Sequence, residues 1–388
     1  MELKKIHISD IGKIITGKTP RTSVAENYDG DIPFLTPSDD LSHKSAPRTT
    51  KTLTEKGLNE VRNCLLPPRS ICVSCIGSDL GKVVMTIEPT VTNQQFNSII
   101  PNKNFNADFV YYLMTLVGRE LNYLSKTSTA VPIINKSSFS NYEVEVPDLE
   151  TQEKIASILS SLDSKIELNR RINDNLEQQA QLLFDNLIDA SDWSTTQFLS
   201  ELSEINPPRK LSKGEYAPFV EMSNMPTSGS FPSRIDYKEY NGGMKFRNGD
   251  TIMARITPCL ENGKAAYVNF LKENEIGFGS TEYIVLAPKK TISSSFLYFL
   301  VRNKDFVDYA VKHMNGSSGR QRVSGDTIGN YQLPILDRNK LSIFIAIADR
   351  TLSKIRQNSF EILNLAKQRD TLLPKLMSGE LKINDLNC

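Results

Sequence analysis

Four short strings in this 388-residue sequence contain residue types that catalytic or metal sites use. The string GKIITGKT, from Gly12 to Thr19, fits the phosphate-loop pattern GxxxxGKS/T, in which backbone N–H groups and a lysine hold nucleotide phosphates. Such a loop must open a helix, but Pro20 disfavours helical dihedral angles at Thr19. Its interior, KIIT, is apolar and β-branched rather than flexible. We therefore expect no ATP site here.

The other three strings also lack partners that their chemistry requires. NPPR ends at Arg209, where the NPPY/F string of amino-methyltransferases has an aromatic residue that stacks on the target base. Asp163 and Lys165 fit the loose nuclease pattern PD…DxK, but residues two apart on a helix do not share a face. Cys72 and Cys75 form one CxxC without a second cysteine pair or clustered histidines. We expect no catalytic residue and no metal site.

Composition is that of an ordinary globular protein. Hydrophobic residues make up 39% and charged residues 23%, and 46 basic groups against 45 acidic groups give a net charge of +1. This balance excludes a polybasic tail protein but not local basic patches. No apolar run approaches the roughly 18 residues of a membrane span, and MELKKIHISD lacks the apolar core of a signal peptide. We expect a cytoplasmic protein with two or three domains and no membrane partner.

The chain contains an internal duplication at an offset of 189 residues. SKIELNRRINDNLEQQAQLLFDNLI, which begins at Ser164, shares nine identities with SKIRQNSFEILNLAKQRDTLLPKLM, which begins at Ser353. Shorter pairs extend the similarity upstream with small gaps: NYEVEVP and NYQLP, DFVYYL and SFLYFL, LGKVVM and NGKAAY, IPFL and APFV. The order of elements is therefore globular unit, helix, globular unit, helix.

Apolar residues at alternating spacings of three and four predict two long helices, since this is the pattern of a coiled coil. Residues 148–189 carry a charge of −5 and residues 337–388 a charge of +3, which favours mutual pairing. Each helix of ~40 residues would be ~60 Å long, and the second should end near Pro374 and Gly379. The residues expected to pair the helices or dock partners are Leu162, Ile166, Asn169, Leu176, Leu183 and Leu187, with Ile355, Asn358, Ile362, Leu365, Leu372 and Leu376. Asn169 and Asn358 could set the register, or could face solvent at the edge of the stripe.

The globular units combine short β-rich runs, turn strings and one helix each. Runs such as SICVSCIG, KVVMTI, DTIMARI and EYIVLAP predict strands, and helices are expected around 107–124 and 294–312. We predict an α+β fold with two similar β-rich domains, 1–147 and 190–336, joined by antiparallel coiled-coil helices, 148–189 and 337–388. The duplication predicts a pseudo-two-fold axis.

Three regions then resemble one known family, the specificity subunit of type I restriction–modification enzymes. They are IGKIITGKTP near the start, VPIINKSSFSNYEVEVPDLETQEKIASILSSLDSKIELNRRINDNLEQQAQLLF in the middle, and GSSGRQRVSGDTIGNYQLPI with QRDTLLPKLMSGEL near the end. The resemblance covers essentially the whole chain. One departure is that the distal ILDRNKLSIFIAIADR lacks the glutamine of ETQEK, so the second helix is expected to begin slightly differently.

The resemblance implies a non-catalytic subunit that gives a larger enzyme its DNA specificity. Its two target recognition domains would each read one half of a bipartite double-stranded DNA sequence, and the two half-sites should differ. The helices would set the gap and dock two modification (methyltransferase) subunits. Restriction/translocase subunits would also join. S-adenosylmethionine, ATP and Mg²⁺ are expected on those partners, and no cofactor is expected on this chain.

Candidate DNA-binding residues are basic, amide or hydroxyl side chains, since such groups contact phosphates and base edges. In the first domain they are Lys18, Thr19, Arg21, Ser78, Lys82, Asn93, Gln94 and Gln95, and in the second Arg255, Lys264, Ser280, Thr281, Arg320 and Arg322. Substituting Arg320 and Arg322 together by alanine should abolish half-site recognition while the complex still assembles. The alternatives are a duplicated coiled-coil scaffold that binds proteins without reading DNA, and an ATPase that uses GKIITGKT.

Overall fold

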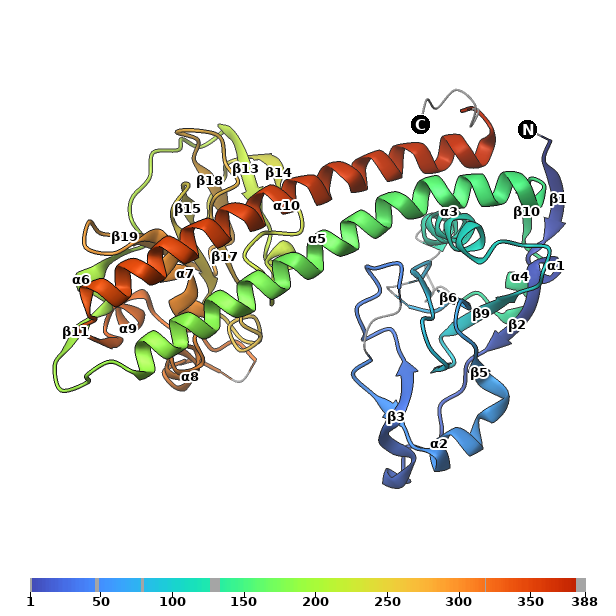
Figure 1. The fold of residues 1–388 in the computed structure, drawn as a ribbon, viewed down its shortest axis with the longest axis horizontal. Coiled ribbons are helices and arrows are strands. Elements are labelled where there is room, and N and C mark those ends of the chain that lie inside the picture. The colour runs from blue at the N-terminus through green and yellow to red at the C-terminus, as the bar shows by residue number, and fades with distance from the viewer. Residues whose placement is uncertain (1, 46–48, 78–79, 126–132, 318, 382–388) are drawn as a thin grey trace. The chain divides into compact units, whose positions relative to one another are not determined.

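A computed structural model describes residues 2–45, 49–77, 80–125, 133–317 and 319–381 of the chain. It divides into two compact units. The first unit joins Met1–Lys165 to Leu365–Cys388, and the second unit is Ile166–Asn364. Figure 1 labels their helices and strands. Among the described residues, no helix is both long and apolar enough to cross a membrane.

The first unit contains two four-stranded sheets. One has the order β2 (Gly12–Thr16), β9 (Phe96–Pro101), β6 (Ile71–Ser74), β7 (Val83–Met85), and the other β4 (Thr52–Leu53), β3 (Tyr28–Leu35), β8 (Thr90–Thr92), β5 (Leu65–Leu66). In the second sheet β3 and β8 are parallel. A separate pair joins β1 (Lys4–His7) to β10 (Glu143–Val146). The helices are α1 (Ile8–Ile11), α2 (Glu55–Glu60), α3 (Ala107–Ser125) and α4 (Lys136–Ser140).

The alternation of side chains along β6 explains why its first three residues are all apolar. Ile71 and Val73 belong to a core shared with α3, whereas Cys72 belongs to a separate core with Phe34 and Leu35 of β3. Successive residues of a strand point to opposite faces. A strand that is buried on both faces therefore has no polar alternation.

The second unit repeats this topology strand for strand. Its sheets have the orders β12 (Ser203–Ile205), β19 (Tyr283–Pro288), β16 (Thr251–Ala254), β17 (Ala265–Tyr267) and β14 (Asp236–Glu239), β13 (Tyr216–Val220), β18 (Gly277–Gly279), β15 (Lys245–Phe246). Again one central pair, β13 and β18, is parallel, and β11 (Thr196–Phe198) pairs with β20 (Gln332–Pro334). The helices are α6 (Leu199–Leu202), α7 (Ser294–Arg302), α8 (Lys304–Lys312) and α9 (Gly325–Gly329). The predicted α+β duplication is confirmed.

One predicted helix of the second unit is in fact two. The sequence pattern predicted a single helix around 294–312, but α7 ends at Arg302 and α8 begins at Lys304. Asn303 between them has an extended backbone, and its side chain accepts a hydrogen bond from the backbone N–H of Phe306. An asparagine that caps a new helix in this way interrupts the old one.

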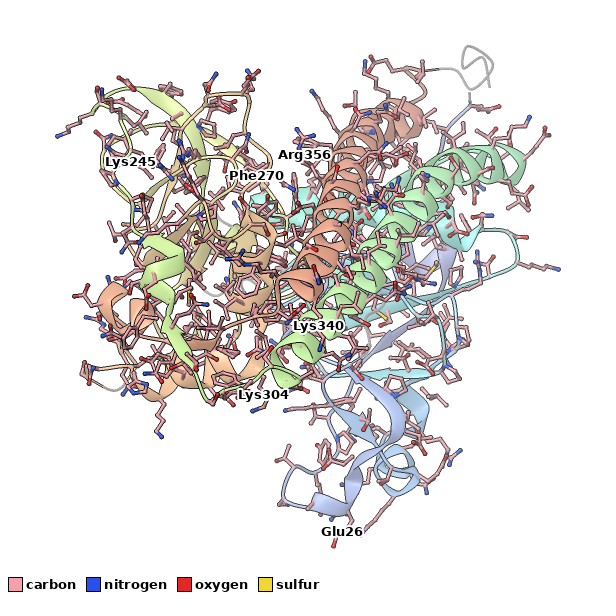
Figure 2. The ribbon with its side chains drawn as sticks, turned by 60° about the vertical axis from the view of Figure 1, so that its left-hand side comes forward. Glu26, Lys245, Phe270, Lys304, Lys340 and Arg356 are labelled. Atoms are coloured by element: carbon pink, nitrogen blue, oxygen red, sulfur yellow. The ribbon has the colours of Figure 1, made fainter. Side chains whose placement is uncertain are left out.

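The two long helices are related by the same offset of 189 residues as the sequence duplication. Helix α5 is Leu149–Asp189 and α10 is Arg338–Ser378, so each has 41 residues and their bounds differ by 189. Asp148 accepts a hydrogen bond from the N–H of Thr151, and Asp337 accepts one from the N–H of Lys340, which marks the start of α10 in Figure 2. A carboxylate before the first turn satisfies N–H groups that have no partner within the helix.

Of two expectations about the ends of α10, the one about its start is wrong and the one about its end is confirmed. Leu341 stands where α5 has Gln152, but α10 begins at the equivalent position because the carboxylate of Asp337 supplies the cap. Pro374 lies inside the helix, which ends at Ser378, near Pro374 and Gly379 as expected. Gly379, with a φ of 73°, ends it, since a left-handed conformation suits glycine.

Within each unit, α5 and α10 lie side by side, as Figure 1 shows. In the second unit, Nδ2 of Asn169 donates to Oε2 of Glu361 at 2.9 Å, and Nδ2 of Asn358 donates to Oδ1 of Asn173 at 2.8 Å. Residue numbers rise along one helix as they fall along the other, so the pair is antiparallel. Asn169 and Asn358 are each only 2% exposed, so they do not face solvent.

Most of the helix-pairing candidates are buried or half-buried, but Leu183 is 42% exposed. Phe184 is fully buried in its place, against Phe296 of α7 and Phe344 of α10. A straight helix drifts ~20° per heptad relative to a strict seven-residue repeat. Near the C-terminal end of α5, the buried face of the helix therefore contains Phe184 instead of Leu183. Leu183 therefore does not pair the helices and remains a candidate for docking only.

Candidate nucleic-acid interface

In the first unit, the segment after β2 meets the turn between β8 and β9. The N–H of Lys18 donates to the carbonyl of Thr92 at 2.9 Å, and Oγ1 of Thr19 donates to Oε1 of Gln94 at 2.6 Å. Gly17 permits this approach, because a Cβ there would lie 2.1 Å from the carbonyl oxygen of Asn93. Polar side chains from two separate segments thus share one edge. The first edge is Lys18, Thr19 and Asn93–Gln95.

The amides of the first edge are partly ordered by one another. Nδ2 of Asn93 donates to Oε1 of Gln95 at 2.9 Å, and Oδ1 of Asn93 accepts from the N–H of Gln95 at 3.0 Å. Gln94 and Lys18 are exposed. The edge therefore presents amides, a hydroxyl and an ammonium group in a preorganised turn.

The remaining first-domain candidates have other surroundings. Arg21 donates through Nε and Nη2 to Oε1 of Glu60, and this pairing lowers the pKa of Glu60 to about 2. Arg21 is thus neutralised, although it is largely exposed. The exposed Lys82 lines a pocket of about 490 Å³ with Tyr111 and Arg119. Ser78 lies outside the described residues.

In the second unit, the turn after β18 meets the ends of β16 and of the loop before α9. The N–H of Arg255 donates to the carbonyl of Glu282 at 3.0 Å, and Oγ of Ser280 accepts from the N–H of Glu282 at 3.1 Å. The carbonyl of Arg255 accepts from the N–H of Val323 at 3.0 Å, which brings Arg322 alongside. The second edge is Arg255, Ser280–Glu282 and Arg322.

Arg322 and Glu282 form a fork-shaped ion pair in the second edge. Nε of Arg322 lies 3.0 and 2.9 Å from the two carboxylate oxygens, and Nη2 lies 2.8 Å from Oε1. The guanidinium lowers the pKa of Glu282, and the carboxylate raises that of Arg322. Glu282 is absent from the predicted set, because that set contains only basic, amide and hydroxyl side chains. Aligning TNQQF with GSTEY would have indicated it.

Two other second-domain candidates behave differently. Nζ of Lys264 donates to the carbonyl of Met222 at 2.8 Å, so this ammonium stabilises a backbone turn. Arg320 is exposed, and its carbonyl accepts from Nη1 of Arg322 at 3.0 Å.

The strings that were set aside as catalytic motifs serve the fold. Gly12–Thr16 is strand β2, and Asp163 accepts hydrogen bonds from the hydroxyl of Tyr112 and from Nη1 of Arg369. Arg209 pairs with the buried Asp250, and Lys245, labelled in Figure 2, donates from Nζ to the carbonyl of Arg209. Among the described residues, no group of three or more His, Cys, Asp or Glu side chains could hold a metal ion.

The CxxC cysteines are part of the core. Cys72 is fully buried and Cys75 is 2% exposed. Burial raises the pKa of Cys72 to about 12 and also raises that of Cys75. Both thiols therefore remain protonated at neutral pH, a state that neither binds metal nor attacks substrates readily.

The long helices of the second unit leave apolar side chains in solvent. Leu182 is 61% exposed, Ile343 62% and Ile347 40%. Ile343 and Ile347 lie one turn apart on α10 and so share a face. Exposed apolar residues that are clustered on one helix face are typical of a protein–protein contact.

Comparison with known proteins places these features in one family. The model described as "Type I restriction modification DNA specificity domain" matches residues 1–178 and again residues 191–340. The type I restriction enzyme MjaIX specificity subunit of Methanocaldococcus jannaschii is 28% identical, over 99% of this chain and 94% of its own length. The HindI specificity subunit of Haemophilus influenzae is 37% identical, over 43% of this chain and 38% of its own.

A solved structure shares the fold. The crystal structure of the S subunit of a type I restriction–modification system from M. genitalium aligns with 97% of this chain and 96% of its own length, with a TM-score of 0.55 and 17% identity. Two matches to one family model, one for each copy of the repeat, agree with the strand-for-strand duplication. The chain belongs to the family of type I restriction–modification DNA specificity subunits, whose role is sequence specificity rather than catalysis.

Proposed function

We propose that each edge reads one half of a bipartite DNA target. The first edge would belong to a target recognition domain at 1–147 and the second to one at 190–336, with spacer helices at 148–189 and 337–388. The observation that carries the proposal is the repeated topology, which gives two equivalent polar turns in a chain of this family. Hydrogen-bonding side chains in ordered turns suit contact with base edges.

The two edges differ in chemistry, which supports two different half-sites. The first turn presents Asn93, Gln94 and Gln95, whereas the equivalent second turn presents Ser280, Thr281 and Glu282. Amides pair well with adenine, while a hydroxyl accepts or donates to several bases. Arginines and a carboxylate accompany only the second turn among the described residues of the two edges.

We further propose that the helices set the gap between half-sites and dock two modification subunits, with restriction/translocase subunits joining the assembly. Buried Asn169 and Asn358 support a fixed register, and exposed Leu182, Ile343 and Ile347 offer apolar docking surface. S-adenosylmethionine, ATP and Mg²⁺ would bind to those partner subunits.

Base-resolution methylome sequencing tests this function. A host without the system would receive this chain together with its neighbouring methyltransferase, or the methyltransferase alone. We expect methylated adenines in a new split motif with two different halves, only when this chain is present. A stable complex that adds no methylation, or a motif with identical halves, would contradict the proposal, and the first result would favour a protein-binding scaffold.

A further inference from the structure

The two edges can be superimposed residue by residue through their backbone hydrogen bonds. Cys75 and Arg255 occupy the same place, because their N–H groups donate to Gln95 and Glu282 respectively. Their carbonyls accept from the N–H groups of Ile134 and Val323. The isolated bridge Ile76 to Ile133 then corresponds to Ile256 to Arg322. Ile133 and Arg322 are 189 residues apart, the offset of the long helices.

One position therefore differs sharply between the copies. Ile133 in the first unit is 62% exposed and has only apolar side-chain atoms. Arg322 in the second unit has a side chain that is 40% exposed and carries five N–H donors. An exposed isoleucine beside one polar turn and an exposed arginine beside the other suggest that this position contributes to the difference between half-sites.

The backbone of Arg322 is held on both sides. Its N–H donates to the carbonyl of Asn315 at 2.9 Å, and its carbonyl accepts from the N–H of Asn315 at 2.9 Å. The opposite side of this segment forms the bridge with Ile256. The side chain thus projects from a fixed point rather than from a loose loop.

The side chain is fixed as well, and its donors are only partly used. Glu282 takes the Nε hydrogen and one Nη2 hydrogen, and the carbonyl of Arg320 takes one Nη1 hydrogen. Among the contacts of the described residues, these bonds engage three of the five N–H groups. One hydrogen on each terminal nitrogen remains for a ligand. Two such donors on a planar group match the O6 and N7 acceptors of guanine in the major groove.

We propose that Arg322 reads a guanine in the second half-site, and that Glu282 is a positioning residue that holds the guanidinium for it. This inference rests on the proposed function. The pairing with Glu282 fixes the plane of the fork before DNA binds, so less side-chain freedom is lost on recognition. Ile133 offers no donor to guanine at the equivalent place, so the first half-site is read differently there.

The test is the same methylome experiment with Arg322→Ala, Arg322→Lys and Glu282→Gln, each with the methyltransferase. The parent motif should specify guanine at one position of the second half-site. Arg322→Ala should reduce the preference for guanine at that position by about 5- to 150-fold, the discrimination expected of a bidentate contact. Arg322→Lys should also relax it, because a lysine keeps the charge but not the fork. Glu282→Gln should relax the same position to a smaller extent.

Arg320→Ala is the matched control, since its exposed side chain lies two residues away in the same segment. It should lower methylation evenly without changing base preference. The first half-site, read in the same sequences, reports whether each variant is folded and assembled. A second half-site without guanine, or an unchanged preference in both Arg322 variants, would overturn this inference while leaving the proposed function intact. The absence of any chain-dependent methylation would instead overturn both.

Discussion

At the scale of single residues, Asp163 shows how a side chain that fits a nuclease string serves packing instead. Its carboxylate accepts from the hydroxyl of Tyr112 at 2.5 Å and from Nη1 of Arg369 at 2.7 Å, so it joins α3, α5 and α10 within the first unit. Burial and this carboxylate raise the pKa of Tyr112, which therefore stays a donor. Asp163→Asn should lower the free energy of unfolding by about 2–3 kcal/mol, because a hydrogen bond to a charged group is lost. Thermal unfolding checks this.

The control for Asp163 is the pair Arg119 with Asp370, whose side chains are 50% and 44% exposed. Exposed ion pairs contribute under about 1 kcal/mol. Arg119→Ala should therefore change the melting temperature much less than Asp163→Asn. Equal shifts in the two variants would contradict a structural role for Asp163.

At the scale of elements, buried Asn169 and Asn358 make polar contacts between the paired helices of the second unit. A buried asparagine in a coiled coil costs stability but specifies register. The double variant Asn169→Leu with Asn358→Leu should therefore melt no lower than the parent, while amide hydrogen exchange in α5 and α10 becomes faster because more than one register is populated. Leu168→Asn, at a position that is 51% exposed, should change neither quantity. A lower melting temperature of the double variant than of the parent would mean that the amides stabilise the helix pair.

The periodic and repeated parts of the elements could be predicted from the sequence, and the local departures could not. The sequence indicated residues 148–189 for the first helix, and α5 is Leu149–Asp189. A heptad pattern could not decide between Leu183 and Phe184, because their burial depends on contacts with Phe296 and Phe344. The side-chain types of the two edges could be chosen from the sequence, but the bond that orients Arg322 joins residues 40 apart in the chain. Such a long-range pairing leaves no local signal.

At the scale of the whole molecule, helix length should determine the gap in the DNA target. Inserting seven residues into α5 after Lys165 and seven into α10 after Asn364 would keep the facing pairs in step. Each insertion lengthens a helix by about 10.5 Å, which is about three base-pair steps. The methylated motif should keep both halves and gain about three positions between them. Inserting into α5 alone should abolish methylation, and an unchanged gap in the double insertion would refute the spacer role.

The division of the chain between the two units also determines the order in which they can fold. The core of the first unit contains Leu373, Leu376 and Met377 of α10, whereas the second unit is one continuous stretch, Ile166–Asn364. At roughly 5–20 residues per second, a ribosome that has finished Lys165 needs about 10–40 s more to reach Leu365. The unit that is synthesised first is therefore completed last. During that interval the first unit lacks the part of α10 that packs on its core, so its apolar surface is exposed. Chaperones should therefore bind nascent chains of intermediate length. Cotranslational folding should begin in the second unit.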